Sequence, residues 1–128
     1  MKNMTIEVNG TSILITQEDV DDIMSAALDS HFVQDWCSEV NVVGRYLGDY
    51  ASEQISRGGE IWFYDIEDES YYGLTLENFM KGLKMYLADN NSVINDNETE
   101  AMIDVGAIDG VAADVIIQYA LFDDIVYS

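Results

Sequence analysis

The sequence contains few basic residues, one cysteine and no proline. Lysine and arginine together number five, and there is a single histidine among 128 residues. One cysteine cannot form an internal disulfide, which agrees with a reducing compartment. No apolar run approaches the roughly 18 residues that a membrane-spanning helix needs, and the first residues lack the apolar segment of a secretory signal. We therefore expect a cytoplasmic protein that does not enter a membrane.

Acidic residues dominate the charge. Twenty-five aspartates and glutamates give a formal net charge of −20 at pH 7, which opposes direct binding to nucleic-acid phosphates. The hydrophobic fraction of 48% and the aromatic fraction of 11% exclude a disordered tail, because disordered segments are poor in the residues that build a core. The length suits one domain covering residues 1–128.

The N-terminal third shows two clear local patterns. Alternating residues 4–8 and 11–16 flank Asn9-Gly10, a pair that favours the type I′ turn of a β-hairpin. Thr16 and Asp19 then have the spacing of a capping box, which marks the start of a helix. The apolar face of this helix has the 3–4 spacing of a buried stripe and comprises Val20, Ile23, Met24, Ala27 and Leu28.

The next segment predicts a connection followed by a helix. Residues 31–41 are expected to connect two elements, with Phe32, Trp36 and Cys37 packed onto the core. A second helix is expected to run toward Arg57 and to end at Gly58-Gly59, where a left-handed residue terminates it. Its apolar stripe comprises Val43, Tyr46, Leu47, Tyr50, Ala51 and Ile55.

The remaining chain predicts a second hairpin and two more helices. Residues 60–66 are continuously apolar and predict a central strand covered on both faces, joined through the charged turn 67–69 to a strand at 70–74. Thr75 is expected to cap a third helix, whose apolar positions are Leu76, Phe79, Met80, Leu83 and Leu87.

Beyond the third helix the pattern is weaker. Residues 89–100 are polar and predict a flexible loop, and 101–108 are ambiguous, with a short strand through Met102 and Ile103. Asp109-Gly110 is expected to open a last helix, and residues 125–127 an edge strand. The inward positions of that helix are expected to be Val111, Val115, Ile116 and Tyr119. The order ββ-α-α-ββ-α-α-β lacks regular β-α-β alternation and predicts an α+β fold.

No pattern in the sequence indicates catalysis or a resident cofactor. His31 and Cys37 invite a thiol–imidazole pair, but the acidic neighbours Asp35 and Glu39 are expected to raise the pKa of the cysteine and suppress its thiolate. Phosphate-binding loops and nucleophile elbows are absent, and 25 acids make any pair of carboxylates uninformative. We expect a protein that is not an enzyme.

Metal binding is also disfavoured. Asp89, Asn91 and Glu100 occupy positions 1, 3 and 12 of an EF-hand-like frame. The frame fails because Val93 lacks a side-chain oxygen at position 5 and Ile94 stands where the turn requires glycine. Weak calcium binding by scattered carboxylates stays open, whereas zinc is disfavoured by the single histidine and single cysteine.

The charge itself is the remaining functional signal. Duplex DNA carries one charge per about 1.7 Å of axis, so twenty charges span about 34 Å of duplex. A domain of 128 residues has a radius of gyration of about 14 Å, so its diameter is comparable to that span. A basic groove would attract such a surface at electrostatically steered rates. Rows of acids with suitable spacing occur on the first helix and at the central hairpin: Glu18, Asp22 and Asp29, and Asp65, Glu67 and Glu69.

These rows predict a contact surface for a basic nucleic-acid-binding protein, bound stoichiometrically and with nucleic-acid mimicry as the mechanism. The residues expected to line it are Glu18, Asp22, Asp65, Glu67, Asp68 and Glu69. Three alternatives stay open. The acidity serves solubility alone, the chain self-associates as a homodimer through Trp62, Tyr71 and Tyr72, or it sequesters a small ligand in a pocket lined by the same tyrosines.

Three segments together resemble a known group of proteins. They are VVGRYLGDYASEQISRGG (42–59), LTLENFMKGLK (74–84) and AADVIIQYALF (112–122), accompanied by the hairpin and the Thr16 helix start. With these the chain resembles small acidic proteins of phages and mobile elements in gut Firmicutes. The resemblance implies a bacterial host cell and an inhibitor of host defence, of anti-CRISPR or anti-restriction type. It assigns no functional residue.

Overall fold

The Asn9-Gly10 turn begins the fold. The computed structural model describes residues 1–96 and 100–128, and in it both turn residues have positive φ angles, 50° and 85°. β1 (Met4–Val8) and β2 (Thr11–Ile15) pair antiparallel around this turn. The predicted hairpin is therefore confirmed, and two consecutive left-handed residues are typical of the type I′ turn, whose twist matches that of the strands.

The hairpin continues into a four-stranded sheet of order β1-β2-β7-β6. β7 (Ala101–Ile103) runs parallel to β2 and antiparallel to β6 (Ile94–Asp96), so the predicted short strand is confirmed. The expected flexible loop at 89–100 is wrong for its described part, which contains a 3₁₀ turn (Asn91–Val93) and β6. Residues 97–99 of that expectation lie outside the described residues.

Three long helices form the centre of the molecule, and side-chain caps fix where each begins. α1 (Gln17–Leu28) starts at Thr16, whose hydroxyl accepts from the Asp19 amide at 3.1 Å while Asp19 accepts from the Thr16 amide at 3.0 Å. α3 (Leu76–Asp89) and α4 (Gly110–Phe122) begin at Thr75 and Asp109. All three predicted helix starts are confirmed.

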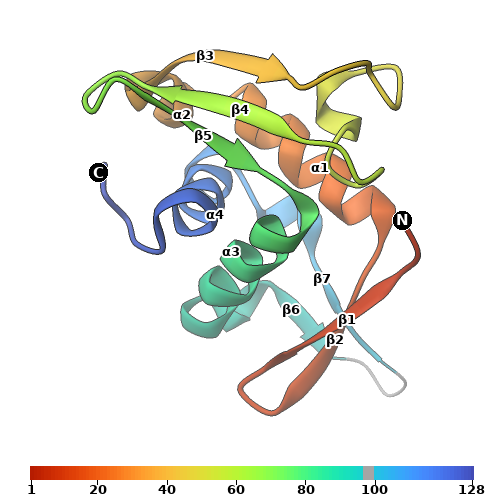
Figure 1. Ribbon diagram of the computed structural model, residues 1–128. Coiled ribbons are helices and arrows are strands. Elements are labelled where there is room, and N and C mark those ends of the chain that lie inside the picture. The colour runs from red at the N-terminus through yellow and green to blue at the C-terminus, as the bar shows by residue number, and fades with distance from the viewer. Residues whose placement is uncertain (97–99) are drawn as a thin grey trace.

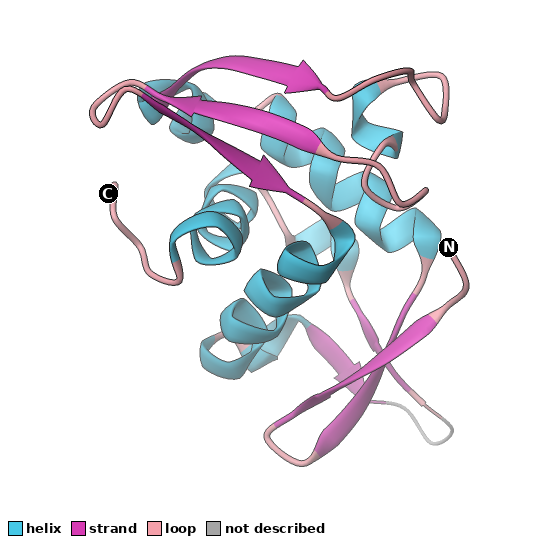
Figure 2. Ribbon diagram, in the orientation of Figure 1, coloured by secondary structure: helices cyan, strands magenta, loops and turns pink. Residues whose placement is uncertain are grey.

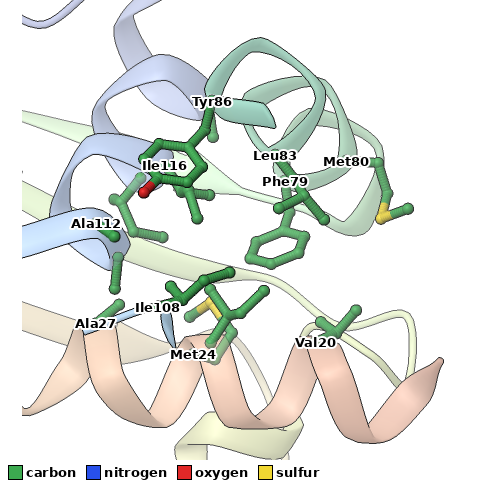
Figure 3. Close-up of a cluster of buried hydrophobic side chains, with 14 of the residues drawn as sticks. Val20, Met24, Ala27, Phe79, Met80, Leu83, Tyr86, Ile108, Ala112 and Ile116 are labelled. Carbon is green, nitrogen blue, oxygen red and sulfur yellow. The ribbon is translucent and has the colours of Figure 1, made fainter. Parts of the chain in front are cut away.

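The core lies where the three helices meet. Val20 and Met24 of α1 lie on the side of Phe79 of α3, and Ala27 of α1 lies beside Ala112 of α4 (Figure 3). α4 differs from its expected register, since Val111 is exposed and Val115 and Tyr119 are half-buried. Neighbours cover α4 over most of its circumference, so its buried positions include small and polar residues: Ala112, Ala113, Asp114, Ile116, Ile117, Gln118 and Ala120.

A second, three-stranded sheet lies on the other side of the helices, so that the helical layer separates the two sheets (Figure 2). It consists of β3 (Cys37–Val42), β4 (Ile61–Asp65) and β5 (Ser70–Leu74), all antiparallel in the order β3-β4-β5. The predicted central hairpin is therefore confirmed. The expectation that β4 is covered on both faces is wrong, because the helices pack against one face only (Figure 1).

The region between α1 and β4 differs most from its prediction. Residues 31–41 are not a connection but form α2 (His31–Trp36) and β3, and Phe32 is exposed. The second predicted helix, from Val43 toward Arg57, is absent. The described residues 43–57 contain one 3₁₀ turn (Ala51–Glu53) instead. Gly58 does supply a left-handed residue, with φ of 87°.

Side chains explain why residues 43–50 do not form a helix. The side-chain oxygen of Gln54 accepts from the backbone amide of Leu47 at 2.9 Å. One carboxylate oxygen of Glu53 accepts from the backbone amides of Asp49 and Tyr50 at 2.8 and 3.0 Å. These bonds satisfy the backbone groups that a helix would otherwise pair. Tyr46 and Tyr50 consequently point to solvent.

The expected edge strand at 125–127 is also wrong. The Gln118 side chain accepts from the amides of Val126 and Tyr127 at 2.9 and 2.8 Å and donates to the Tyr127 carbonyl at 2.9 Å. One glutamine thus takes the place of a neighbouring strand. Among the residues that the structure describes, no helix combines the length and the apolar character needed to cross a membrane.

Candidate functional site

The six acids predicted to line a contact surface fall into two groups. Glu18 and Asp22 lie in the first turns of α1, whereas Asp65, Glu67, Asp68 and Glu69 lie at the end of β4 and in the turn that follows. The start of α1 and the β4–β5 turn occupy opposite ends of the molecule (Figure 1). The fold therefore does not bring the six carboxylates onto one patch.

Asp65 does not belong to the surface. Its side chain is only 2% exposed, because alternation along β4 points it inward with Ile61 and Phe63. Both of its oxygens accept from the Tyr127 hydroxyl, at 2.7 and 2.6 Å, and one accepts from the Glu67 amide at 3.0 Å. The prediction for Asp65 is corrected: its carboxylate holds the C-terminal segment and the base of the turn.

The other three acids of this group form a tip that we call the acidic turn, residues 67–69. Glu67, Asp68 and Glu69 are all exposed. Within residues 1–96 and 100–128, the ion pairs join Arg57 to Asp21 and Glu53, and Lys81 to Asp123, so none involves this turn. The acidic turn thus presents three consecutive carboxylates that form no ion pair with a basic side chain of the described residues.

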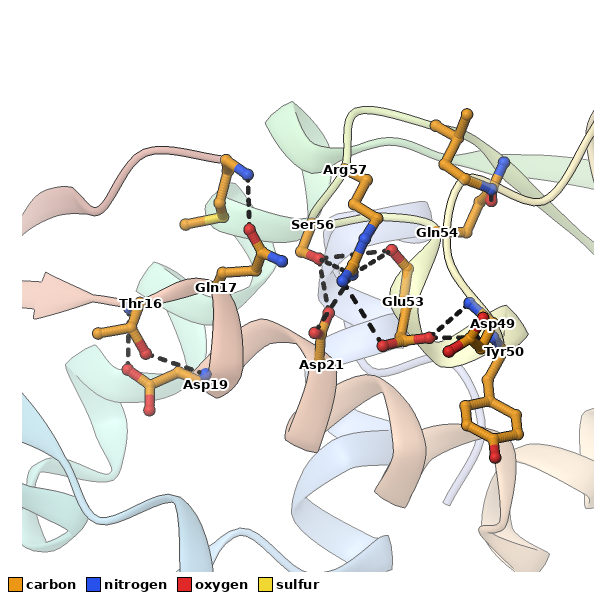
Figure 4. Close-up of polar contacts among 12 residues, drawn as sticks. Thr16, Gln17, Asp19, Asp21, Asp49, Tyr50, Glu53, Gln54, Ser56 and Arg57 are labelled. Carbon is orange, nitrogen blue, oxygen red and sulfur yellow. Dashed lines mark hydrogen bonds and ion pairs between the residues drawn. The ribbon is translucent and has the colours of Figure 1, made fainter.

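The acids on α1 are in a different environment. Glu18 and Asp22 line a shallow hollow of about 460 Å³ together with Asp21 and Glu53. Arg57 lies 3.5 Å from Asp21 and 3.6 Å from Glu53, and Ser56 donates to Asp21 at 2.6 Å (Figure 4). Part of this charge is therefore neutralised within the fold. No group of three or more potential metal ligands occurs in the described part of the chain.

Aromatic rings cover the face of the three-stranded sheet that the helices leave open. Trp62 and Tyr71 are 44% and 48% exposed, and Tyr64 lies beside them half-buried. The ring centroids of Trp62 and Tyr71 are 5.9 Å apart, and those of Tyr64 and Tyr71 are 4.9 Å apart in an edge-to-face arrangement. We call this surface the outer face; its residues are Glu39, Asn41, Glu60, Trp62, Tyr64, Tyr71 and Gly73.

Two carboxylates are fixed among these rings. Glu39 accepts from the Asn41 amide group at 2.7 Å and from the Tyr71 hydroxyl at 3.0 Å, and these bonds lower the pKa of Glu39. Glu60 accepts from the indole N–H of Trp62. Both carboxylates are thereby oriented beside an aromatic ring, and Glu39 is held in its charged form.

Sequence reasoning identified part of this face. Trp62, Tyr71 and Tyr72 belong to the alternative of self-association. Trp62 and Tyr71 are exposed, whereas Tyr72 points to the other side of the sheet and packs on Phe122 at a centroid distance of 4.8 Å. Glu39 was missed because residues 31–41 were not predicted to contain a strand, and Glu60 because the strand predicted at 60–66 was expected to be covered on both faces. The alternation of Trp62 and Tyr64 in β4 is the signal that places these two rings on one face.

The thiol–imidazole pair has no support in the geometry. Cys37 is buried, and burial raises the pKa of its thiol, with the charges of Asp65 and Glu39 raising it further. The sequence predicted this direction, but the second charge comes from Asp65 and not from Asp35. His31 is exposed at the start of α2. A buried, protonated thiol is a poor nucleophile.

Another hollow, of about 740 Å³, lies between the end of α3 and α4. Tyr86, Tyr119, Asp89 and Asp109 are among its lining residues. The tyrosines expected to line a ligand pocket, Tyr71 and Tyr72, do not belong to it.

Comparisons with protein-family models, with curated proteins and with solved structures give no match for this chain. Its function must therefore be argued from the acidic turn and the outer face themselves.

Proposed function

We propose that this protein inhibits a basic, nucleic-acid-binding defence protein of a bacterial host by binding to it stoichiometrically. The observation that carries the proposal is the acidic turn, where Glu67, Asp68 and Glu69 are exposed and no ion pair of the described residues offsets them. A carboxylate shares with a phosphate its negative charge and its preference for arginine and lysine donors. The acidic turn thus presents to a basic groove the negatively charged hydrogen-bond acceptors that a nucleic-acid backbone presents.

The charge of the whole chain supports the same partner. A net charge of −20 steers a basic protein toward the surface from a distance, and the local carboxylates then determine the contact. Because β4 and β5 carry both the acidic turn and the outer face, a partner at the turn can also reach the rings of Trp62 and Tyr71.

Self-association through the outer face is the less favourable alternative. Two copies carry −20 each, and joining their outer faces would bring the carboxylates of Glu39 and Glu60 toward like charges. Like charges that lose water at an interface cost several kcal/mol, on the order of a whole hot spot. Acidity that serves solubility alone does not account for exposed aromatic rings between fixed carboxylates.

The proposal is tested by displacement of nucleic acid. Purified protein is added to restriction endonucleases and CRISPR effector complexes holding fluorescent duplex DNA or guide RNA, and release is followed by anisotropy. We expect release at a one-to-one ratio for at least one of them. The triple variant Glu67→Lys, Asp68→Lys, Glu69→Lys should weaken this release at least tenfold at physiological salt, because it replaces attraction by repulsion.

A second triple variant controls for net charge. Glu7→Lys, Asp96→Lys and Asp104→Lys change the charge by the same amount at exposed positions around the other sheet. We expect this control to release nucleic acid with less than a threefold loss. Equal losses in the two variants, or no release by any protein of the panel, contradict the proposal. A melting curve for each variant verifies that it is folded.

A further inference from the structure

The outer face has a feature that net charge does not explain, namely an exposed tryptophan paired with a glycine on the neighbouring strand. Gly73 is opposite Trp62 in the strand pairing, and a Cβ at Gly73 would lie 3.5 Å from the indole ring and 2.9 Å from a Glu60 oxygen. The indole is thus in ordinary van der Waals contact with this position, and the Glu60 carboxylate occupies space that a side chain at Gly73 would take. Trp62 nevertheless keeps 44% of its surface exposed.

The two carboxylates flank the two exposed rings. Glu60 is bound to the indole N–H of Trp62, Glu39 is bound to the hydroxyl of Tyr71, and the centroids of these rings are 5.9 Å apart. No ion pair of the described chain involves either glutamate. The surface therefore combines flat aromatic area with oriented hydrogen-bond acceptors of negative charge.

We propose that the outer face is an arginine-binding surface, on which guanidinium groups of the basic partner stack on Trp62 and Tyr71 and donate to Glu60 and Glu39. This inference rests on the proposed function and specifies which residue of the partner is recognised. A guanidinium is planar, stacks on aromatic rings and donates in a fixed fork to a carboxylate, whereas the lysine ammonium is a strongly hydrated point charge.

Charge complementarity selects this occupant over the others. A second copy of the chain brings carboxylates and not cations to the face, as argued above. A neutral apolar partner would bury the Glu39 and Glu60 carboxylates without a counter-charge, which is costly. An arginine can stack on the rings and donate hydrogen bonds to the carboxylates at the same time.

The test compares two peptides of equal charge. Fluorescent hexa-arginine and hexa-lysine are titrated with the protein at 0.3 M NaCl, a salt concentration that screens attraction between exposed charges. We expect hexa-arginine to bind about threefold to tenfold more tightly than hexa-lysine. Trp62→Leu should remove most of this preference, and Glu39→Gln should reduce it.

A matched control and a local probe accompany the titration. Tyr50 is an exposed aromatic residue that lies against α1, so Tyr50→Leu should leave the preference unchanged. Of the two tryptophans, Trp36 is 2% exposed and donates its N–H to Asp114, whereas Trp62 is on the outer face. In ¹⁵N NMR spectra the indole peak of Trp62 should shift with hexa-arginine while that of Trp36 stays in place.

The outcomes separate the inference from the proposed function. Arginine recognition is overturned if the two peptides bind equally and Trp62→Leu does not change their binding. The proposed function stands in that case if the acidic-turn variant loses binding to both peptides. Failure of both peptides to bind at 0.05 M NaCl overturns the two together. A dimer in sedimentation equilibrium that Trp62→Leu dissociates shows a second copy on this face and overturns the inference.

Discussion

At the scale of single residues, the most demanding environment is that of Asp114. This carboxylate is buried in α4, where it accepts from the Trp36 indole at 2.7 Å and from the Gln118 amide group at 2.9 Å. Burial raises its pKa above the ordinary 3.8, and the two hydrogen bonds oppose that shift without cancelling it. The hydrogen bonds from Trp36 and Gln118 stabilise the carboxylate in its buried position. The carboxylate in turn orients Gln118, which holds the segment ending at Tyr127.

The raised pKa of Asp114 predicts a pH dependence of stability with a definite sign. Between pH 3.8 and the folded-state pKa, the folded protein binds more protons at this site than the unfolded chain. Asp114 therefore favours folding more as pH falls and less as pH rises. The free energy of unfolding of the native protein, measured in urea relative to Asp114→Asn, should grow as pH is lowered from 7 toward 4. Its slope should reach at most about 1.4 kcal/mol per pH unit.

An exposed aspartate provides the reference for that measurement. Asp104→Asn removes a carboxylate that is open to solvent, so it measures what the loss of one exposed charge does to stability over the same range. The change of overall repulsion with pH is common to both variants and cancels in the comparison. A native-minus-Asp114→Asn difference that is flat, or that falls at low pH, would show that burial does not control this group.

At the scale of elements, α3 and α4 meet at a glycine. A Cβ at Gly82 would lie 2.5 Å from the Ile116 carbonyl oxygen and 2.7 Å from the Ala120 nitrogen, both of them backbone atoms. Backbone atoms cannot rotate away as a flexible side chain can. Gly82 thus permits the close approach of the two helices, at the cost of about 1 kcal/mol in helix propensity relative to alanine.

This packing predicts that Gly82→Ala destabilises the protein although alanine is the better helix former. Separating two packed helices costs about 1–3 kcal/mol or more, which exceeds the propensity gain of about 1 kcal/mol. We expect the free energy of unfolding in urea to fall by about 2 kcal/mol. Lys84→Gly compared with Lys84→Ala, at an exposed position inside the same helix, calibrates propensity and should cost about 1 kcal/mol. A stability gain in Gly82→Ala would rule out the close approach.

Elements with a local signal were predictable from the sequence, and those determined by distant contacts were not. Asn9-Gly10, Thr16 and Thr75 act on their own neighbours, and the turn and helices that they indicate are present. The stripe from Val43 to Ile55 has helical spacing but forms mostly loop, because Glu53 and Gln54 bind its backbone amides. Helical spacing alone does not reveal which side chains will compete for the backbone.

The same distinction applies to the candidate site. Glu67, Asp68 and Glu69 are adjacent in the chain, so their common turn was predictable from the sequence. The outer face also requires β3 beside β4, and the residues that β3 supplies, Glu39 and Asn41, were missed together with that strand. The spacing of two residues predicts Asp65, Glu67 and Glu69 in one row along a strand, but β4 ends at Asp65, and its alternation points Asp65 inward.

At the scale of the whole molecule, charge opposes folding and favours partner binding. Twenty net negative charges repel one another in the compact state, and within the described residues ion pairs engage only Asp21, Glu53 and Asp123. Repulsion of this kind destabilises a folded protein and is weakened by salt. Attraction to a basic partner is weakened by the same ions.

Salt should therefore change folding and binding in opposite directions. Between 0.02 and 0.5 M NaCl we expect the free energy of unfolding to rise by about 1 kcal/mol, seen as a melting temperature higher by roughly 3–5 °C. Over the same range, release of nucleic acid from a bound partner should weaken at least tenfold. The acidic-turn variant has a net charge of −14, because each of three reversals adds two charges to −20, and its salt-dependent gain should be smaller. Stability that falls with NaCl would show that the carboxylates do not repel one another in the folded protein, and binding that is insensitive to NaCl would contradict electrostatic recognition by the acidic turn.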